Sequence, residues 1–203
     1  MKFQARHYRE PLERIRSTLL QIAQGGRKTL LLCPCGRGDV ADQVTAALAV
    51  AFAADSRRVL LLTSSNGIDR LGCKVKDLGG FAELLERDVV PELASGVNLA
   101  RRPEAADPGA LERARLEPFL RGAAAAADLV LLAAPDASHP IVRAAAPLVD
   151  GVVFVISGKS TRRSDALAVT ESVTRLGGRP VGFVFADDHQ PVPGFIRRWF
   201  HFG

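Results

Sequence analysis

Short apolar runs recur along the chain and predict the strands of a sheet. Each run is continuous rather than alternating, which is typical of a strand that is buried on both faces. The strands expected from these runs are 29–33, 59–63, 97–100, 129–132, 152–156 and 181–185. Because helical stretches separate the runs, the pattern predicts a single α/β domain with a doubly wound, mainly parallel sheet in three α/β/α layers.

The helical stretches between these runs have the spacing of amphipathic helices. The helices expected are about 8–24, 40–54, 80–85, 109–126, 140–148 and 162–176. In the first, apolar residues recur at three- and four-residue steps from Tyr8 to Ile22, while the opposite face is charged. Gly25 and Gly26 are expected to end this helix.

A glycine loop follows the first apolar run and is the candidate functional site. A strand, a glycine loop and a helix in this order suit phosphate binding, because glycine lets the backbone come close and the helix N-terminus offers unpaired N–H groups. The candidate loop residues are Gly36, Arg37, Gly38 and Asp39. Asp39 and Asp42 suit a helix N-terminus but would repel a triphosphate. The alternative is a tight turn that binds nothing.

Composition and charge argue against a nucleic-acid-binding, a membrane-spanning or a secreted protein. The net charge of +5 is spread along the chain, which permits contact with anionic lipid or an acidic partner but does not indicate nucleic-acid binding. No apolar run approaches the roughly 20 residues of a membrane-spanning helix, and the charged N-terminus lacks the apolar core of a signal peptide. Together with an odd number of cysteines, three, these features predict a cytoplasmic protein.

The cysteines and histidines do not form a recognisable chemical motif. Cys33 and Cys35 flank a proline, a spacing typical neither of a redox pair nor of a zinc site, so buried or incidental thiols are expected. His139 and His189 follow predicted strands but lack metal-ligand spacing, so they are expected to be polar loop residues. Asp136 is expected to be a loop or capping residue.

Motifs at the strand ends, taken in order, resemble those of one known family. The segments that carry the resemblance are Glu10 to Arg16, Val59 to Leu62, Gly80 to Leu85, Asp128 to Leu132 with Pro135, Pro147 to Gly151 with Thr161, and Val181 to Phe185. Their order and spacing are similar to those of the bacterial tyrosine kinases (BY-kinases) of exopolysaccharide and capsule synthesis, which belong to the deviant-Walker ATPases. The resemblance covers nearly the whole chain and implies a P-loop-NTPase-like fold.

The phosphate loop departs from the pattern of this family. The family loop ends in Gly-Lys-Ser/Thr, in which the lysine neutralises phosphate charge and the hydroxyl ligates Mg²⁺. Here Asp39 follows Gly38, and no lysine occurs between Lys28 and Lys74. The resemblance therefore implies that binding of ATP or ADP with Mg²⁺ is doubtful.

The aspartate motifs of the family are replaced as well. Thr63 and Ser65 lie where the family has its Walker A′ aspartates, and Ala133 lies where it has the Walker B aspartate. Ala186 lies where the family has an asparagine for the nucleotide base. The chain has a single tyrosine, Tyr8 near its start, which excludes a C-terminal tyrosine cluster. The resemblance thus implies a degenerate member with no catalytic residue, no metal ligand and no cofactor.

The resemblance also implies partners. The family uses a Glu-x-x-Arg-x-x-Arg helix for oligomerisation; Glu10 and Arg16 fit its outer positions, and Glu13 lies where the middle arginine would be. This helix is expected to contact another subunit in a homo- or hetero-oligomer, and packing on its own domain is the alternative. By analogy with the family, the expected partner is an inner-membrane polysaccharide co-polymerase.

The tail, residues 193–203, is rich in aromatic and basic side chains. The candidate contact residues are Phe195, Arg197, Arg198, Trp199 and Phe200. This composition suits an anionic membrane surface or a membrane partner, so the protein is expected to be cytoplasmic and peripheral at the inner membrane. A tail folded back on the domain is the alternative.

The sequence therefore predicts a degenerate scaffold or regulator of bacterial surface-polysaccharide synthesis and export. One alternative is a weakly active or nucleotide-binding ATPase of the partition or positioning type, in which Arg37 supplies the cation. Another is an NADP-binding protein, because residues 36–41 match G-x-G-x-x-A and Ser64, Ser65 and Arg70 could receive the NADP phosphate. The lack of a recognisable hydride-transfer site argues against the second alternative.

Overall fold

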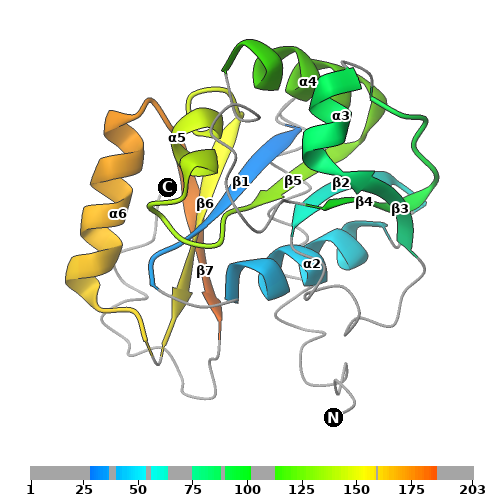
Figure 1. The fold of residues 1–203 in the computed structure, drawn as a ribbon. Helices are drawn as coiled ribbons and strands as arrows, with labels where there is room; N and C mark the ends of the chain where they lie inside the picture. The colour runs from blue at the N-terminus through cyan, green and yellow to red at the C-terminus, as the bar shows by residue number, and fades with distance from the viewer. Residues whose placement is uncertain are drawn as a thin grey trace.

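A seven-stranded parallel sheet lies at the centre of the part of the chain that the structure describes (Figure 1). The structure is a computed structural model that describes residues 28–36, 40–53, 56–63, 75–87, 90–101, 113–158 and 160–186. The strand order is β3-β4-β2-β5-β1-β6-β7, and each pair of neighbouring strands is parallel. The doubly wound parallel sheet predicted from the apolar runs is therefore confirmed.

Strands and helices alternate along the described chain. The strands are β1 (Thr29–Pro34), β2 (Arg58–Thr63), β3 (Val75–Gly80), β4 (Gly96–Arg101), β5 (Leu129–Ala133), β6 (Gly151–Ser157) and β7 (Pro180–Ala186). The helices are α2 (Val40–Ala53), α3 (Phe81–Arg87), α4 (Arg113–Ala126), α5 (Pro140–Ala145) and α6 (Arg163–Arg175). The helix expected at 8–24 lies outside the described residues, and α5 ends before the predicted residue 148 because residues 146–148 form a turn.

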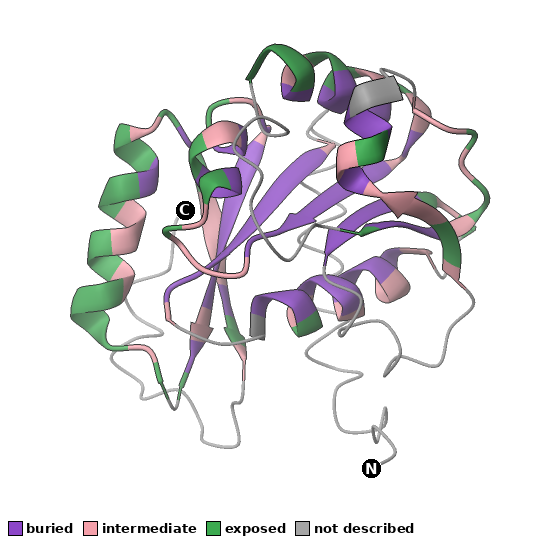
Figure 2. Ribbon diagram, viewed as in Figure 1, coloured by how far each residue is buried: buried purple, intermediate pink, exposed green. Residues whose placement is uncertain are grey.

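Helices cover both faces of the sheet and bury the central strands (Figure 2). Alternate residues of β1 point to opposite faces: Leu31 packs in the core cluster with residues of α3, α4, α5 and α6, whereas Leu30 and Leu32 pack in the cluster with residues of α2. All three leucines are fully buried. The continuous apolar runs follow from this arrangement, because a central strand has no face in water.

The apolar pattern did not predict β3. Among the described strands β3 lies at one side of the sheet and pairs with β4 alone, and its Lys76 and Asp77 are exposed. The pairing shifts register between Asp77 and Gly80, and Gly79 has φ 91°, a conformation that favours glycine. An outer strand with one exposed side needs no continuous apolar run, which explains why the sequence carried no strand signal here.

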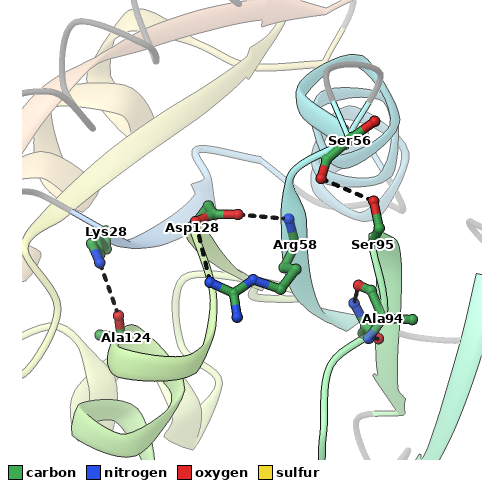
Figure 3. A network of polar contacts seen from close by, with 8 residues as sticks. Lys28, Ser56, Arg58, Ala94, Ser95, Ala124 and Asp128 are labelled. Carbon is green, nitrogen blue, oxygen red and sulfur yellow. Dashed lines mark hydrogen bonds and ion pairs between the residues drawn. The ribbon is translucent and has the colours of Figure 1, made fainter.

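Hydrogen bonds hold the strand starts together at the amino-terminal side of the sheet (Figure 3). Asp128, directly before β5, accepts a hydrogen bond from the backbone N–H of Arg58 at 2.8 Å and pairs with the Arg58 guanidinium at 3.6 Å. The backbone hydrogen bond is the main cause of the lowered pKa of Asp128, which burial opposes. Ser95 Oγ donates to the carbonyl of Ser56 at 2.9 Å and joins the start of β4 to the segment before β2.

Asp150 joins the starts of β1 and β6 in the same way. Its Oδ2 accepts hydrogen bonds from the backbone N–H of Lys28 at 2.9 Å, the backbone N–H of Thr29 at 2.8 Å and the Thr29 hydroxyl at 2.7 Å. The backbone N–H of Asp150 in turn donates to Thr29 Oγ1 at 2.9 Å. One carboxylate therefore satisfies three donors where the first strand enters the sheet.

Replacing this carboxylate should destabilise the fold. We expect Asp150→Ala to lower the free energy of unfolding by about 2 kcal/mol, because it removes charge-assisted hydrogen bonds and leaves partly buried donors without this acceptor. Urea unfolding followed by circular dichroism measures the change. Glu171→Ala, which removes an exposed carboxylate from α6, is the matched control and should cost less than about 0.5 kcal/mol. Equal effects of the two substitutions would contradict the role given to Asp150.

Candidate functional site

The predicted phosphate loop lies at the carboxyl-terminal side of the sheet, where proteins of this architecture bind ligands. β1 lies between β5 and β6. From β1 the chain continues to β2, towards the β3 edge of the sheet, whereas from β5 it continues to β6, towards the β7 edge. The direction in which strands are added therefore reverses next to β1. The ends of β1, β2, β5 and β6 therefore form the candidate site.

Gly36 is the one residue of the predicted loop quartet that the structure describes. The preceding N–H, of Cys35, donates to the carbonyl of Val155 in β6 at 2.8 Å. A Cβ atom on Gly36 would lie 3.0 Å from Thr161 Oγ1 and 3.6 Å from Ser160 Oγ. Glycine thus avoids a tight contact with the segment that joins β6 to α6. Loop residues Arg37, Gly38 and Asp39 lie outside the described residues.

A buried carboxylate lies between the first turn of α2 and the end of β2. Asp42 is 4% exposed and Thr63, the last residue of β2, is 0% exposed. The Thr63 hydroxyl donates a hydrogen bond to Asp42 Oδ1 at 2.5 Å. The partial positive charge of a helix N-terminus favours a carboxylate at this position. The candidate site therefore contains a buried carboxylate of the chain's own, which accepts a hydrogen bond from the last residue of β2.

Sequence reasoning recognised Asp42 as a carboxylate near a helix N-terminus but did not predict its pairing with Thr63. The available signal was the position of Asp42 on the buried face of α2, which it shares with Ala41, Thr45 and Ala46. A carboxylate on such a face requires a polar partner. Which partner it finds depends on the packing of α2 against β2, and local sequence patterns do not contain that information.

Ala133 ends β5 beside Thr63. The residues before them, Leu132 and Leu62, are paired in register, so the last residues of the two strands lie at the same level. Ala133 and the following Ala134 are fully buried. Their methyl groups offer no ligand to a metal ion, and no group of three or more His, Cys, Asp or Glu side chains in the described parts of the chain could hold one. Ser65 lies outside the described residues.

Cys33 at the end of β1 and Cys35 directly after it have unreactive, protonated thiols. Cys33 and Cys35 are free and buried, as expected from the sequence. Burial raises the pKa of the Cys33 thiol to about 12, with smaller contributions from Cys35 and Asp136, and burial raises the pKa of Cys35 to about 11. Neither thiol is ionised near neutral pH, which argues against a nucleophilic role.

Asp136 and His139 stabilise the turn between β5 and α5. Asp136 Oδ1 accepts hydrogen bonds from the Ser138 backbone N–H at 2.8 Å and from its hydroxyl at 2.5 Å. Burial opposes ionisation of Asp136, but these hydrogen bonds and the nearby His139 lower its pKa overall. His139 caps α5, because its Nδ1 accepts from the backbone N–H of Ile141 at 3.2 Å. Asp136 is therefore a residue of the loop, one of the two roles expected for it, and the cap of α5 is His139.

The remaining candidate residues lie outside the described residues. They are Glu10, Glu13 and Arg16 of the predicted first helix, and Phe195, Arg197, Arg198, Trp199 and Phe200 of the tail. Their roles stay predictions. None of the helices in the described ranges has the length and apolar character needed to cross a membrane.

Solved structures of bacterial tyrosine-kinase domains share this fold. The kinase domain of the Escherichia coli tyrosine kinase ETK aligns with a TM-score of 0.74 and 15% sequence identity, over 91% of this chain and 78% of that chain. The BceF tyrosine kinase domain aligns with a TM-score of 0.70 and 20% identity, over 87% of this chain and 76% of that chain. For the VpsO kinase domain the TM-score is 0.62 at 16% identity, with coverages of 89% and 98%.

These likenesses define the fold of the chain. No protein-family model and no curated protein matches the sequence. The MinD cell division protein of Aquifex aeolicus is similar over 85% of this chain and 73% of that chain, with a TM-score of 0.52 and 16% identity. The chain therefore has the P-loop-NTPase-like α/β fold of bacterial tyrosine-kinase domains, as its strand-end motifs suggested.

The raised thiol pKa values predict a loss of stability at alkaline pH. In the unfolded chain both thiols ionise near 9.0, whereas in the native state they keep their protons up to about 11 and about 12. Because the unfolded state loses these protons first, the free energy of unfolding should fall as the pH rises from about 9 towards 11.

The double variant Cys33→Ala/Cys35→Ala isolates this effect. Under reducing conditions, urea unfolding at a series of alkaline pH values should show a shallower decline in the variant than in the parent chain, because other titrating groups are common to both. Parallel pH profiles in the two proteins would show that the thiols ionise equally in the folded and unfolded states.

Proposed function

We propose that the chain is a catalytically degenerate relative of the BY-kinase domains that acts as a scaffold or regulator of bacterial exopolysaccharide or capsule synthesis and export. The shared fold and the ordered strand-end motifs support the relationship. The observation that supports a loss of catalytic chemistry is the buried pair of Asp42 and Thr63. The pair lies where the start of α2 meets the end of β2, the region in which nucleotide-binding relatives bind phosphate and metal.

The charge of this region disfavours a nucleotide. A triphosphate bound at the start of α2 is stabilised by cations and by Mg²⁺. Asp42 instead brings a buried carboxylate to the first turn of α2. Its negative charge competes with a phosphate for the partial positive charge of the same helix terminus.

At the described strand ends, Thr63 and Ala133 supply no carboxylate to a magnesium ion, and the carboxylate of Asp42 already accepts a hydrogen bond from Thr63. The Thr63 hydroxyl donates a hydrogen bond to Asp42, and Ala133 has no ligand atom in its side chain. Oxygen ligands from carboxylates are what a magnesium ion requires of a protein. This gap at the described positions supports a role in assembly rather than in phosphoryl transfer.

The proposed partner is an inner-membrane polysaccharide co-polymerase. The protein is proposed to be cytoplasmic and peripheral at the inner membrane, where the aromatic and basic tail contacts the partner or anionic lipid. The first helix, with Glu10, Glu13 and Arg16, is proposed to contact another subunit. No nucleic acid is part of this proposal.

Calorimetric titration with ATP and ADP, with and without Mg²⁺, tests the proposed degeneracy. We expect no binding heat at millimolar nucleotide, because the Asp42 carboxylate lies at the start of α2 and neither Thr63 nor Ala133 supplies a carboxylate to Mg²⁺. Micromolar binding that requires Mg²⁺ would instead favour a weakly active ATPase, and tight binding of NADPH without Mg²⁺ would favour a dinucleotide-binding protein.

A matched pair of variants shows whether Asp42 is the cause. Asp42→Asn removes the charge and keeps an oxygen that can accept from Thr63, so any residual ATP affinity should increase. Asp165→Asn removes an exposed carboxylate from the first turn of α6 and should change nothing. An equal change of ATP affinity in the two variants would show that the charge of Asp42 does not cause the weak nucleotide binding.

Truncation of the tail tests the membrane contact. The chain without residues 195–203 should lose association with vesicles that contain anionic lipid, because the aromatic and basic side chains of the tail are removed. Vesicle sedimentation measures the bound fraction, and vesicles of neutral lipid are the control. If the full chain does not bind anionic vesicles, the tail has no affinity for lipid.

A further inference from the structure

The start of α5 is capped by a side chain whose charge can change near neutral pH. The backbone N–H of Ile141 donates a hydrogen bond to Nδ1 of His139 at 3.2 Å. Helix caps are usually oxygen atoms of Ser, Thr, Asp or Asn, which keep one charge state near neutrality. The ordinary pKa of histidine is about 6.5. A modest change of pH can therefore remove the cap of α5.

The hydrogen bond to Ile141 requires a neutral ring. A ring nitrogen accepts a hydrogen bond only in neutral imidazole, because both nitrogens carry protons and donate when the ring is charged. Pro140, the first residue of α5, has no N–H, so the N–H of Ile141 is the first donor of the helix. Protonation of His139 would replace an accepted hydrogen bond by repulsion between two N–H groups at the positive end of the helix.

Asp136 offers the protonated ring a different partner. It lies in the same turn, and its Oδ1 accepts the backbone N–H and the hydroxyl of Ser138. Burial opposes ionisation of Asp136, but the hydrogen bonds from Ser138 and the charge of His139 lower its pKa overall. A carboxyl group with a lowered pKa is ionised from pH 5 to pH 8, so Asp136 attracts a charged His139 over this whole range.

The other titratable and charged groups around α5 act less directly. α5 packs against α4 and β1, and its Ala145 shares a core cluster with Val173 of α6. From β1, the thiols of Cys33 and Cys35 are protonated near neutral pH. The charged side chains of the three helices lie at the surface, where solvent screens them. They are Arg113, Arg115, Glu117 and Arg121 on α4, Arg143 on α5, and Arg162, Arg163, Asp165, Glu171 and Arg175 at or on α6.

The first turn of α5 supports the core beside the candidate site. Ile141 and Val142 are each 1% exposed and lie in one core cluster with Cys33 and Cys35. α5 has only six residues, so its first turn is a large part of the helix. The helix follows β5 and begins at the carboxyl-terminal side of the sheet (Figure 1). A change in this turn alters the surface next to the loop after β1.

We propose that His139 is a pH-sensitive switch. The neutral ring caps α5, and protonation moves the ring from the N–H of Ile141 to the carboxylate of Asp136 and loosens the first turn of the helix. The cap is complete above the titration of His139 and is lost as the pH falls through it. This inference concerns residues 136–142 and does not depend on the proposed function.

Amide exchange of Ile141 in the full chain tests the cap. NMR gives the exchange rate, and division by the intrinsic rate at each pH gives a protection factor. We expect this factor to fall about three- to tenfold from pH 8 to pH 5, since a side-chain cap contributes roughly that much to a helix start. His139→Asn keeps an acceptor that does not titrate and should make the factor independent of pH. His139→Ala should give low protection at both pH values.

A second titration tests the role of Asp136. The Cε1–H signal of His139 reports the pH at which the ring is half protonated. Asp136→Asn keeps an oxygen for Ser138 but removes the charge, so this midpoint should move to lower pH by about 0.5. Asp165→Asn, on the surface of α6, is the control and should leave the midpoint unchanged. The other histidines of the chain serve as internal references in the same spectra: His7, His189 and His201.

Three results would overturn the switch. The first is a protection factor of Ile141 that stays constant from pH 8 to pH 5 in the parent chain. The second is an equal fall in His139→Asn, which would assign the pH dependence to another group. The third is a midpoint that Asp136→Asn leaves in place, which would exclude the carboxylate as the partner of the charged ring. Circular dichroism verifies that each variant is folded at both pH values.

Discussion

Burial of β1 on both faces and along both sides is the constraint on which the rest of the structure depends. The strand pairs with β5 and β6 and has helices above and below, so its central residues, Leu30 to Leu32, must be apolar. Such a strand has no solvent-facing position at which a functional side chain could stand. Function is therefore displaced to the strand ends, where the chain leaves the core and the backbone turns into α2.

The central strands and their helices could be predicted from sequence because burial on two faces leaves a continuous apolar signal, as in Val59 to Leu62 and Leu129 to Leu132. β3 could not be predicted, because an outer strand with Lys76 and Asp77 in water resembles a loop. The reason is physical. The apolar content of a strand reflects how far its side chains are buried, and the side chains of an outer strand are buried least.

The position of the candidate site at the strand ends could be predicted from the sequence, but the contacts within the site could be predicted only in part. The strand ends beside which Gly36 and Ala133 lie follow from the apolar runs, whereas the roles given to these two residues stay predictions. The hydrogen bond between Asp42 and Thr63 joins residues 21 positions apart, and it exists because the first turn of α2 packs against the end of β2. No local pattern in a sequence encodes which buried acid meets which hydroxyl, since that depends on the approach of two elements that are each regular.

The amino-terminal and carboxyl-terminal sides of the sheet serve separate purposes. Asp128 and Asp150 hold the strand starts with charge-assisted hydrogen bonds, far along the strands from the loop after β1. Residues at the loop can therefore change without weakening these contacts. The separation gives the fold a form of robustness: a lineage can lose a chemical activity at one side of the sheet and still inherit a stable domain, which remains available for selection as an assembly surface.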